Sequence, residues 1–311
     1  MSRDAFPPDL LDTREASPRH IRSQRERTPS DSRDGRNSGC DEGRPGRNAD
    51  GREQQPTRDE RSQSVRAYYL RDRTHFLRDS EVHSLAEVGK FRVIAAPDLV
   101  RYAYHGDRAR MEKDTHHLSR QGFLVDRTID TSQEKTLRIL TLTKRGHRLL
   151  EGTNRFPTGQ TVYHGLRKPR EAKHDADLYR LYQKEVARVK RLGGRPLRTI
   201  LDYELKKNLN RDLALLGPEK DNLERKAARA EKHGLQVVNG KIPLPDLRLE
   251  YETPDGEIRH VDLELATRDY RPIGLAEKAK AGFALYSRPE DAGRLRRVLD
   301  DREITTGILS L

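Results

Sequence analysis

The chain has 311 residues, enough for about two domains, and 36% of them are charged against 33% that are hydrophobic, so part of it lies outside any packed core. No window approaches the roughly 18 apolar residues of a membrane helix, the N-terminus lacks the apolar core of a secretory signal, and the single cysteine, Cys40, excludes an internal disulfide. These features predict a soluble protein of the reducing cytoplasm that has no membrane partner.

The net charge of +12 is concentrated in the middle of the chain. Residues 64–152 hold 17 Lys and Arg against 12 Asp and Glu, and residues 153–195 hold 11 against 4, whereas the segments on either side are balanced. A basic block of this kind points to a polyanionic partner, most often nucleic acid. The alternative is a solvated basic surface that maintains solubility.

Residues 1–64 are predicted to be a disordered tail. The segment is rich in Arg, Asp, Ser, Gly and Pro and has almost no aliphatic periodicity. It therefore cannot bury enough apolar surface to offset the entropy lost on ordering. Its balanced charges argue against specific DNA binding by the tail. The short apolar stretch Val65–Leu70 follows, and we expect it to pack against the next domain.

Residues 65–152 are predicted to form a winged helix-turn-helix domain. Three helices, a two-stranded wing and a trailing helix make up this fold, and its third helix enters the major groove of DNA. The expected helices are Glu81–Gly89 with Ser80 as N-cap, Pro97–Tyr104, Arg108–Gln121 with Asp107 as N-cap, and Lys144–Leu150 with Thr143 as N-cap; the expected strands are Phe123–Thr128 and Leu137–Leu142.

The third helix is expected to carry most of the DNA contacts, with Ala109, Met111 and either His117 or Leu118 pointing inward. Arg and Lys reach guanine edges or phosphates, and Thr serves either. The wing tip and the basic linker over residues 153–173 are expected to follow phosphates. The DNA-binding residues predicted in this way are Arg108, Arg110, Lys113, Thr115, His116, Arg120, Arg127, Lys135, Arg167, Lys168 and Arg170. Use of the domain for protein docking is the alternative.

Residues 174–311 are predicted to form a second α/β domain with a helical insertion. Without the insertion, the predicted order is helix, strand, strand, strand, helix, strand. The expected elements are helix Asp175–Leu192, strand Arg198–Leu205, inserted helices at about Lys206–Leu216 and Pro218–His233, strands Leu244–Tyr251 and Glu257–Ala266, helices Leu275–Tyr286 and Asp291–Leu299, and strand Ile304–Leu309.

This αβββαβ order and its carboxylates resemble the core of the PD-(D/E)xK nucleases, which have the restriction-endonuclease-like fold. The resemblance rests on Pro245-Asp246, on Glu264 inside an apolar strand, and on Glu185 of the first helix. It implies that these three acids are catalytic and that Asp246 and Glu264 hold Mg²⁺ or Mn²⁺. Asp262 shares the strand face of Glu264 and is a further candidate ligand. The alternative places Asp262 and Glu264 on the solvated face of an ordinary hairpin.

The sequence departs from the nuclease pattern at one position. The lysine expected two residues after the strand acid is replaced by Ala266. We therefore expect Lys278 or Lys280, on the following helix, to supply the ammonium. Without such a lysine the site is degenerate and the domain is a scaffold.

Taken together, the two halves resemble the replication-relaxation family of plasmid and mobile-element proteins. The motifs are Gly89-Lys90-Phe91-Arg92-Val93, Leu142-Thr143-Lys144-Arg145-Gly146-His147, Pro245-Asp246 and Leu263-Glu264-Leu265. The resemblance implies a role in plasmid replication, DNA topology or transfer. Three hypotheses follow: an accessory protein that binds double-stranded DNA, a metal-dependent endonuclease or nickase, and a transcription regulator that forms a homodimer through its C-terminal domain.

Overall fold

The computed structural model describes residues 64–130, 136–153, 155–166, 171–215, 217, 222–268 and 270–311. The chain divides into two units, Met1–Gln54 and Gln55–Leu311, and every described residue belongs to the second. The predicted disordered tail thus lies outside the described residues, except for Ser64. None of the helices in the described part of the chain is long and apolar enough to cross a membrane.

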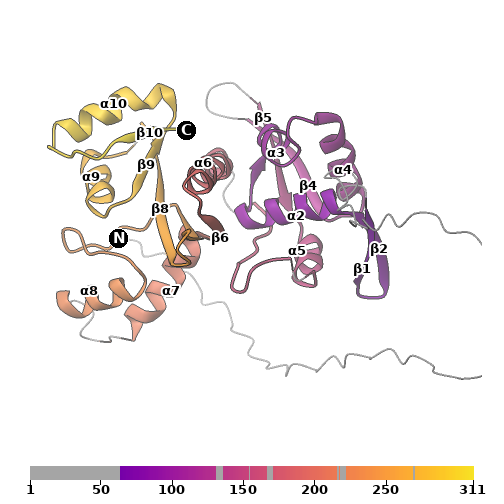
Figure 1. The fold of residues 1–311 in the computed structure, drawn as a ribbon, viewed down its shortest axis with the longest axis horizontal. Coiled ribbons are helices and arrows are strands. Elements are labelled where there is room, and N and C mark those ends of the chain that lie inside the picture. The colour runs from indigo at the N-terminus through magenta and orange to yellow at the C-terminus, as the bar shows by residue number, and fades with distance from the viewer. Residues whose placement is uncertain are drawn as a thin grey trace, which may run out of the picture. The chain divides into compact units, whose positions relative to one another are not determined.

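The protein is a mixed α and β structure, as predicted, and residues 65–151 form a winged helix (Figure 1). Strand β5 lies between β3 and β4 in an antiparallel sheet, and the β4–β5 hairpin is the wing. The elements are β1 (Val65–Leu70), β2 (Arg73–Arg78), α2 (Asp79–Phe91), β3 (Ile94–Ala95), α3 (Ala96–Tyr102), α4 (Arg108–Arg120), β4 (Leu124–Asp130), β5 (Thr136–Leu142) and α5 (Lys144–Glu151).

Side-chain caps explain where two of these helices begin. The Asp107 carboxylate accepts a hydrogen bond from the backbone N of Arg110 at 3.0 Å, and Thr143 Oγ1 accepts one from Gly146 N at 3.0 Å, as predicted. The prediction that Ser80 caps the first helix was wrong. That helix begins at Asp79, and the Glu81 carboxylate accepts from the backbone N of Arg78 at 2.7 Å instead.

The β1–β2 hairpin is an element that the sequence did not predict. Its two strands pair antiparallel over their whole length. On its inner face the ring of His75 packs edge-on against Phe123, with 4.9 Å between centroids, and Leu77 is fully buried. The stretch Val65–Leu70 therefore does pack against the winged helix, as one strand of a hairpin.

The C-terminal part is built on a five-stranded sheet in the order β10-β9-β8-β7-β6. Strands β6, β7 and β8 are antiparallel neighbours, whereas β9 and β10 join the sheet in parallel. The elements are α6 (Ala172–Arg191), β6 (Arg195–Leu201), α7 (Asp202–Ala214), α8 (Leu223–Lys232), β7 (Leu247–Glu252), β8 (Ile258–Ala266), α9 (Pro272–Lys280), β9 (Ala284–Ser287), α10 (Pro289–Asp300) and β10 (Ile308–Ser310).

Several boundaries differ from the prediction, and two of these differences change how the sheet is built. The strand expected to reach Leu205 ends at Leu201, because the chain enters α7 at Asp202, whose backbone N donates to the Asp246 carbonyl at 3.1 Å. The helix expected over Leu275–Tyr286 ends at Lys280. Gly282, whose φ of 81° lies in the left-handed region, starts the turn into β9. The fourth strand of the core is therefore β9, not the C-terminal strand.

The two faces of this sheet bury different helices. Leu263 and Leu265 of β8 share a hydrophobic cluster with Leu178 and Leu181 of α6. Because strand side chains alternate, the intervening residue Glu264 faces the other side, where Ala266 and Leu285 pack against α9. This alternation decides which of the predicted acids can meet.

Helix α6 also contacts the winged helix. The ring of Tyr179 packs edge-on against Phe91, with 5.2 Å between centroids. Arg180 donates to both carboxylate oxygens of Asp98, at 3.2 and 3.0 Å. The long first helix of the second domain is thus part of the winged-helix core.

Candidate functional site

Helix α4 presents a row of cationic side chains. Arg108, Lys113, His116 and Arg120 are exposed, as predicted, and Arg110 is half-buried. Thr115 was predicted to face outward, and this was wrong: it is buried, and its hydroxyl donates to the Met111 carbonyl at 2.9 Å. Met111 and Leu118 point inward, as predicted, and His117 is half-buried. The prediction that Ala109 points inward was wrong, because it is exposed in the first turn of the helix.

A buried polar network fixes α4 against α2 and the N-terminal hairpin. Arg78 pairs with Asp114 of α4 at 2.8 Å and with Glu81 of α2 at 2.8 Å. Glu81 also lies 2.5 Å from Nδ1 of His117. Both acids are almost fully buried, so their pairing is needed to offset the cost of desolvation. This network was not predicted, because Asp114 and His117 of α4 lie more than 30 residues along the chain from Arg78 and Glu81.

The wing is tied to the same helix. Arg138 of β5 lies 2.6 Å from Glu112 of α4 and 2.6 Å from Asp126 of β4. Arg127, on the wing, is exposed as predicted. The remaining predicted DNA contacts, Lys135, Arg167, Lys168 and Arg170, lie outside the described residues. The ion pairs of Arg138 therefore hold the wing against α4.

The second candidate site is an acidic cluster on the α9 side of the sheet. The backbone N of Asp246 donates to Glu264 Oε2 at 3.2 Å, and the Asp246 carboxylate accepts from Leu265 N at 2.9 Å. Lys278 Nζ lies 2.9 Å from Glu264, and the hydroxyl of Tyr270 also donates to Glu264. Of the predicted catalytic set, the structure brings together Asp246, Glu264 and Lys278.

Burial sets the charge state of this cluster. Desolvation, and then the neighbouring Asp246, raise the pKa of Glu264 to about 7. His174 Nε2 lies 3.4 Å from the Asp246 carboxylate. Burial lowers the pKa of His174, but its interactions with the nearby carboxylates of Asp175 and Asp246 outweigh this and raise the pKa to about 10. Neither His174 nor Tyr270 was predicted as part of the site.

The other predicted residues lie elsewhere. Glu185 is fully buried on the α6 side, where the Tyr286 hydroxyl donates to it at 2.7 Å; Arg188 Nε donates at 2.8 Å. Tyr286 pairs with Leu265 in the sheet, so it faces away from Glu264. Asp262 forms a buried ion pair with Arg248 at 2.6 Å. Lys280 is exposed on α9.

These positions decide how well the cluster fits a divalent cation. Mg²⁺ requires several oxygen ligands in a near-octahedral arrangement. Asp246 and Glu264 already accept hydrogen bonds from Leu265 N, Lys278 and Tyr270. Among the residues that the structure describes, no group of three His, Cys, Asp or Glu side chains is placed to hold a metal ion. The residues present do not fit the predicted metal in this arrangement.

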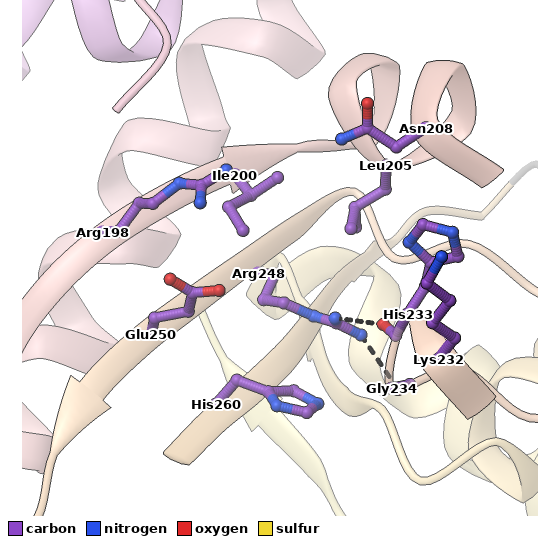
Figure 2. Close-up of a pocket in the computed structure, with 10 residues that line it drawn as sticks. All are labelled: Arg198, Ile200, Leu205, Asn208, Lys232, His233, Gly234, Arg248, Glu250 and His260. Atoms are coloured by element: carbon purple, nitrogen blue, oxygen red, sulfur yellow. Dashed lines mark hydrogen bonds between the residues drawn. The ribbon is translucent and has the colours of Figure 1, made fainter. Parts of the chain in front are cut away.

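A pocket on the same sheet face lies between the strands and the inserted helices (Figure 2). Arg198, Glu250 and His260 project from the strands, and Lys232 and His233 come from the end of α8. Arg248 donates to the carbonyls of His233 and Gly234 at 2.5 and 3.0 Å, as the dashed lines in Figure 2 show. With Asp262 on its other side, Arg248 fastens the insertion to the sheet.

Comparisons with known proteins add little to this description. No family model and no curated protein matches the chain. Among solved structures, the chain is similar to Bacillus subtilis PadR in complex with operator DNA, at 13% sequence identity and a TM-score of 0.22, over 50% of this chain and 93% of that one. Because that TM-score is so low, the winged helix is identified from its own elements and sheet order.

Proposed function

We propose that this protein binds double-stranded DNA through α4 and the β4–β5 wing. The observation that carries the proposal is the exposed row of Arg108, Lys113, His116 and Arg120. The helix that carries this row is held by the Arg78–Asp114 ion pair and by the contact of Glu81 with His117. A rigid cationic helix beside a two-stranded wing suits the major groove and its flanking phosphates. The excess of positive charge in residues 64–195 supports the same partner.

In its finer form, the proposal is a DNA-binding accessory protein of a plasmid or mobile element, of the replication-relaxation type. The support for this is the sequence resemblance described above together with the winged helix. We assign the C-terminal domain a scaffolding role, because Glu185 is separated from Asp246 and Glu264 by the sheet. In that role α6 supports the winged helix, through contacts such as Phe91 with Tyr179.

Salt-dependent binding to a mixed-sequence duplex of about four helical turns tests the DNA-binding proposal. We expect binding that weakens steeply between about 50 and 200 mM salt. The double variant Arg108→Ala/Lys113→Ala should reduce the slope of log K against log salt by about 1.8, since each phosphate contact contributes about 0.9. The charge-matched control is Arg294→Ala/Arg296→Ala on α10. It should leave the slope unchanged, because both arginines are exposed on a helix that is not part of the winged helix.

Two results would contradict the proposal. One is the absence of duplex binding by the wild type at low salt. The other is an equal loss of binding in the α10 control and the α4 variant, which would indicate a diffuse charge effect. A footprint on a palindromic operator would favour the transcription-regulator alternative over the accessory role, because a symmetric site requires a symmetric dimer.

A further inference from the structure

The β1–β2 hairpin has an outer face that no part of the described chain covers. Its register places Val65, Ala67, Tyr69 and Phe76 on the face opposite to the buried His75 and Leu77. The exposed fractions are 58% for Val65, 79% for Tyr69 and 63% for Phe76. Several large apolar side chains gathered on one exposed strand face mark an interaction surface.

This apolar strip is continuous with the cationic face of α4. Val65 and Phe76 line a hollow together with Lys113, His116 and Arg120. The strip therefore lies directly beside the side chains proposed to contact DNA. We therefore expect a duplex bound to α4 to contact the hairpin as well.

The tip of the hairpin carries positive charge. The turn holds Arg71, with φ of 55°, and Asp72, and Arg73 follows at the start of β2, so the tip carries one net positive charge. Both side chains are exposed, and the structure gives neither of them an ion-pair partner within the residues it describes. A guanidinium group binds phosphate well, so Arg71 and Arg73 give the tip, beside the apolar strip, two groups that can contact a DNA backbone.

We propose that the β1–β2 hairpin is a second DNA-contact element, in which Arg71 and Arg73 bind phosphates and Tyr69 and Phe76 pack against sugars and base edges. This inference rests on the proposed function. A second copy of the chain fits the surface less well, because charged residues are depleted from the core of protein interfaces and these cations would face their own copies. Residues 1–63 fit less well too, since their charges balance.

The test uses the full chain and the mixed-sequence duplex described above, with three variants. Arg71→Ala/Arg73→Ala should reduce the salt slope by about 1.8 while leaving the thermal midpoint unchanged. Tyr69→Ser/Phe76→Ser should weaken binding about fivefold at every salt concentration, because it removes apolar contact and no charge. Arg71→Lys/Arg73→Lys should retain the wild-type slope.

The outcomes separate this inference from the proposed function. If the hairpin variants bind like the wild type while Arg108→Ala/Lys113→Ala loses affinity, the hairpin proposal fails and DNA binding by α4 stands. If the serine variant changes oligomeric state in sedimentation but not DNA affinity, the strip contacts a second copy and the proposal is overturned. If the wild type binds no duplex, both proposals fall together.

Discussion

At the scale of single residues, Glu264 is the side chain whose environment has the clearest measurable consequence. Burial and Asp246 raise its pKa from the ordinary 4.5 to about 7. The folded state thus keeps a proton that the unfolded chain releases above pH 4.5. This carboxyl therefore contributes stability that is present at low pH and lost as the pH rises from about 4.5 to about 7, by up to about 3 kcal/mol.

The variant Glu264→Gln has no charge to release, so its free energy of unfolding should lack this loss. We expect the difference between wild type and variant, measured by urea unfolding, to shift in favour of the variant between pH 5 and pH 8. Glu290→Gln changes an exposed acid and is the matched control. Parallel stability curves for wild type and Glu264→Gln across this range would show that Glu264 titrates as an ordinary carboxyl.

The sequence predicted which side chains are buried where helical periodicity is unambiguous. It failed for residues at the edge of the buried stripe of α4. Helical periodicity correctly placed Met111 inside and Lys113 and His116 outside, and of its two alternatives, His117 and Leu118, the buried one is Leu118. Thr115 was misplaced because it lies at the edge of the buried stripe, where its hydroxyl satisfies the Met111 carbonyl. Partners distant in sequence, such as Arg78 with Asp114, leave no periodic trace at all.

At the scale of elements, the packing of α5 depends on a glycine. A Cβ added to Gly146 would overlap the carbonyl oxygen of Phe123, which is backbone and cannot rotate away. Helix propensity alone favours alanine over glycine by about 1 kcal/mol. We expect the steric term to win, so that Gly146→Ala lowers the free energy of unfolding by about 2 kcal/mol.

Thermal unfolding of Gly146→Ala beside Gly152→Ala measures this effect. Gly152 is the C-cap of the same helix, and its added Cβ would meet the Leu149 carbonyl at an ordinary 3.5 Å. The control should therefore unfold close to the wild-type midpoint. A Gly146→Ala protein as stable as the control would mean that α5 can shift away from Phe123 at little cost.

Some helices and strands could be predicted from the sequence, whereas others could not. The caps at Asp107 and Thr143 and the alternating wing strands were strong local patterns, and they were confirmed. The β1–β2 hairpin was missed because only its inner residues are buried, so β2 shows little apolar alternation. Strand β9 was missed because four residues after a helix are too short to show a period of their own.

At the scale of the whole molecule, the order of elements was more predictable than the meeting of side chains. The αβββαβ core was correctly ordered, although its last strand was placed too far along the chain. Whether Glu185 reaches Asp246 depends on which face of the sheet α6 covers. Helix α6 covers the face that carries the β8 leucines, Leu263 and Leu265. A motif of acids separated in sequence does not indicate which face of the sheet the helix covers.

The arrangement of the whole C-terminal domain predicts that the protein does not cut DNA. Phosphodiester hydrolysis by a divalent cation requires several converging oxygen ligands. Here Glu185 is satisfied by Tyr286 and Arg188 on the α6 side, while Lys278 and Tyr270 engage Glu264 on the other. Supercoiled plasmid incubated with the protein and Mg²⁺ or Mn²⁺ should therefore stay intact, even at salt concentrations low enough for binding. Nicking that disappears in Asp246→Ala/Glu264→Ala would show instead that the cluster rearranges on DNA and is catalytic.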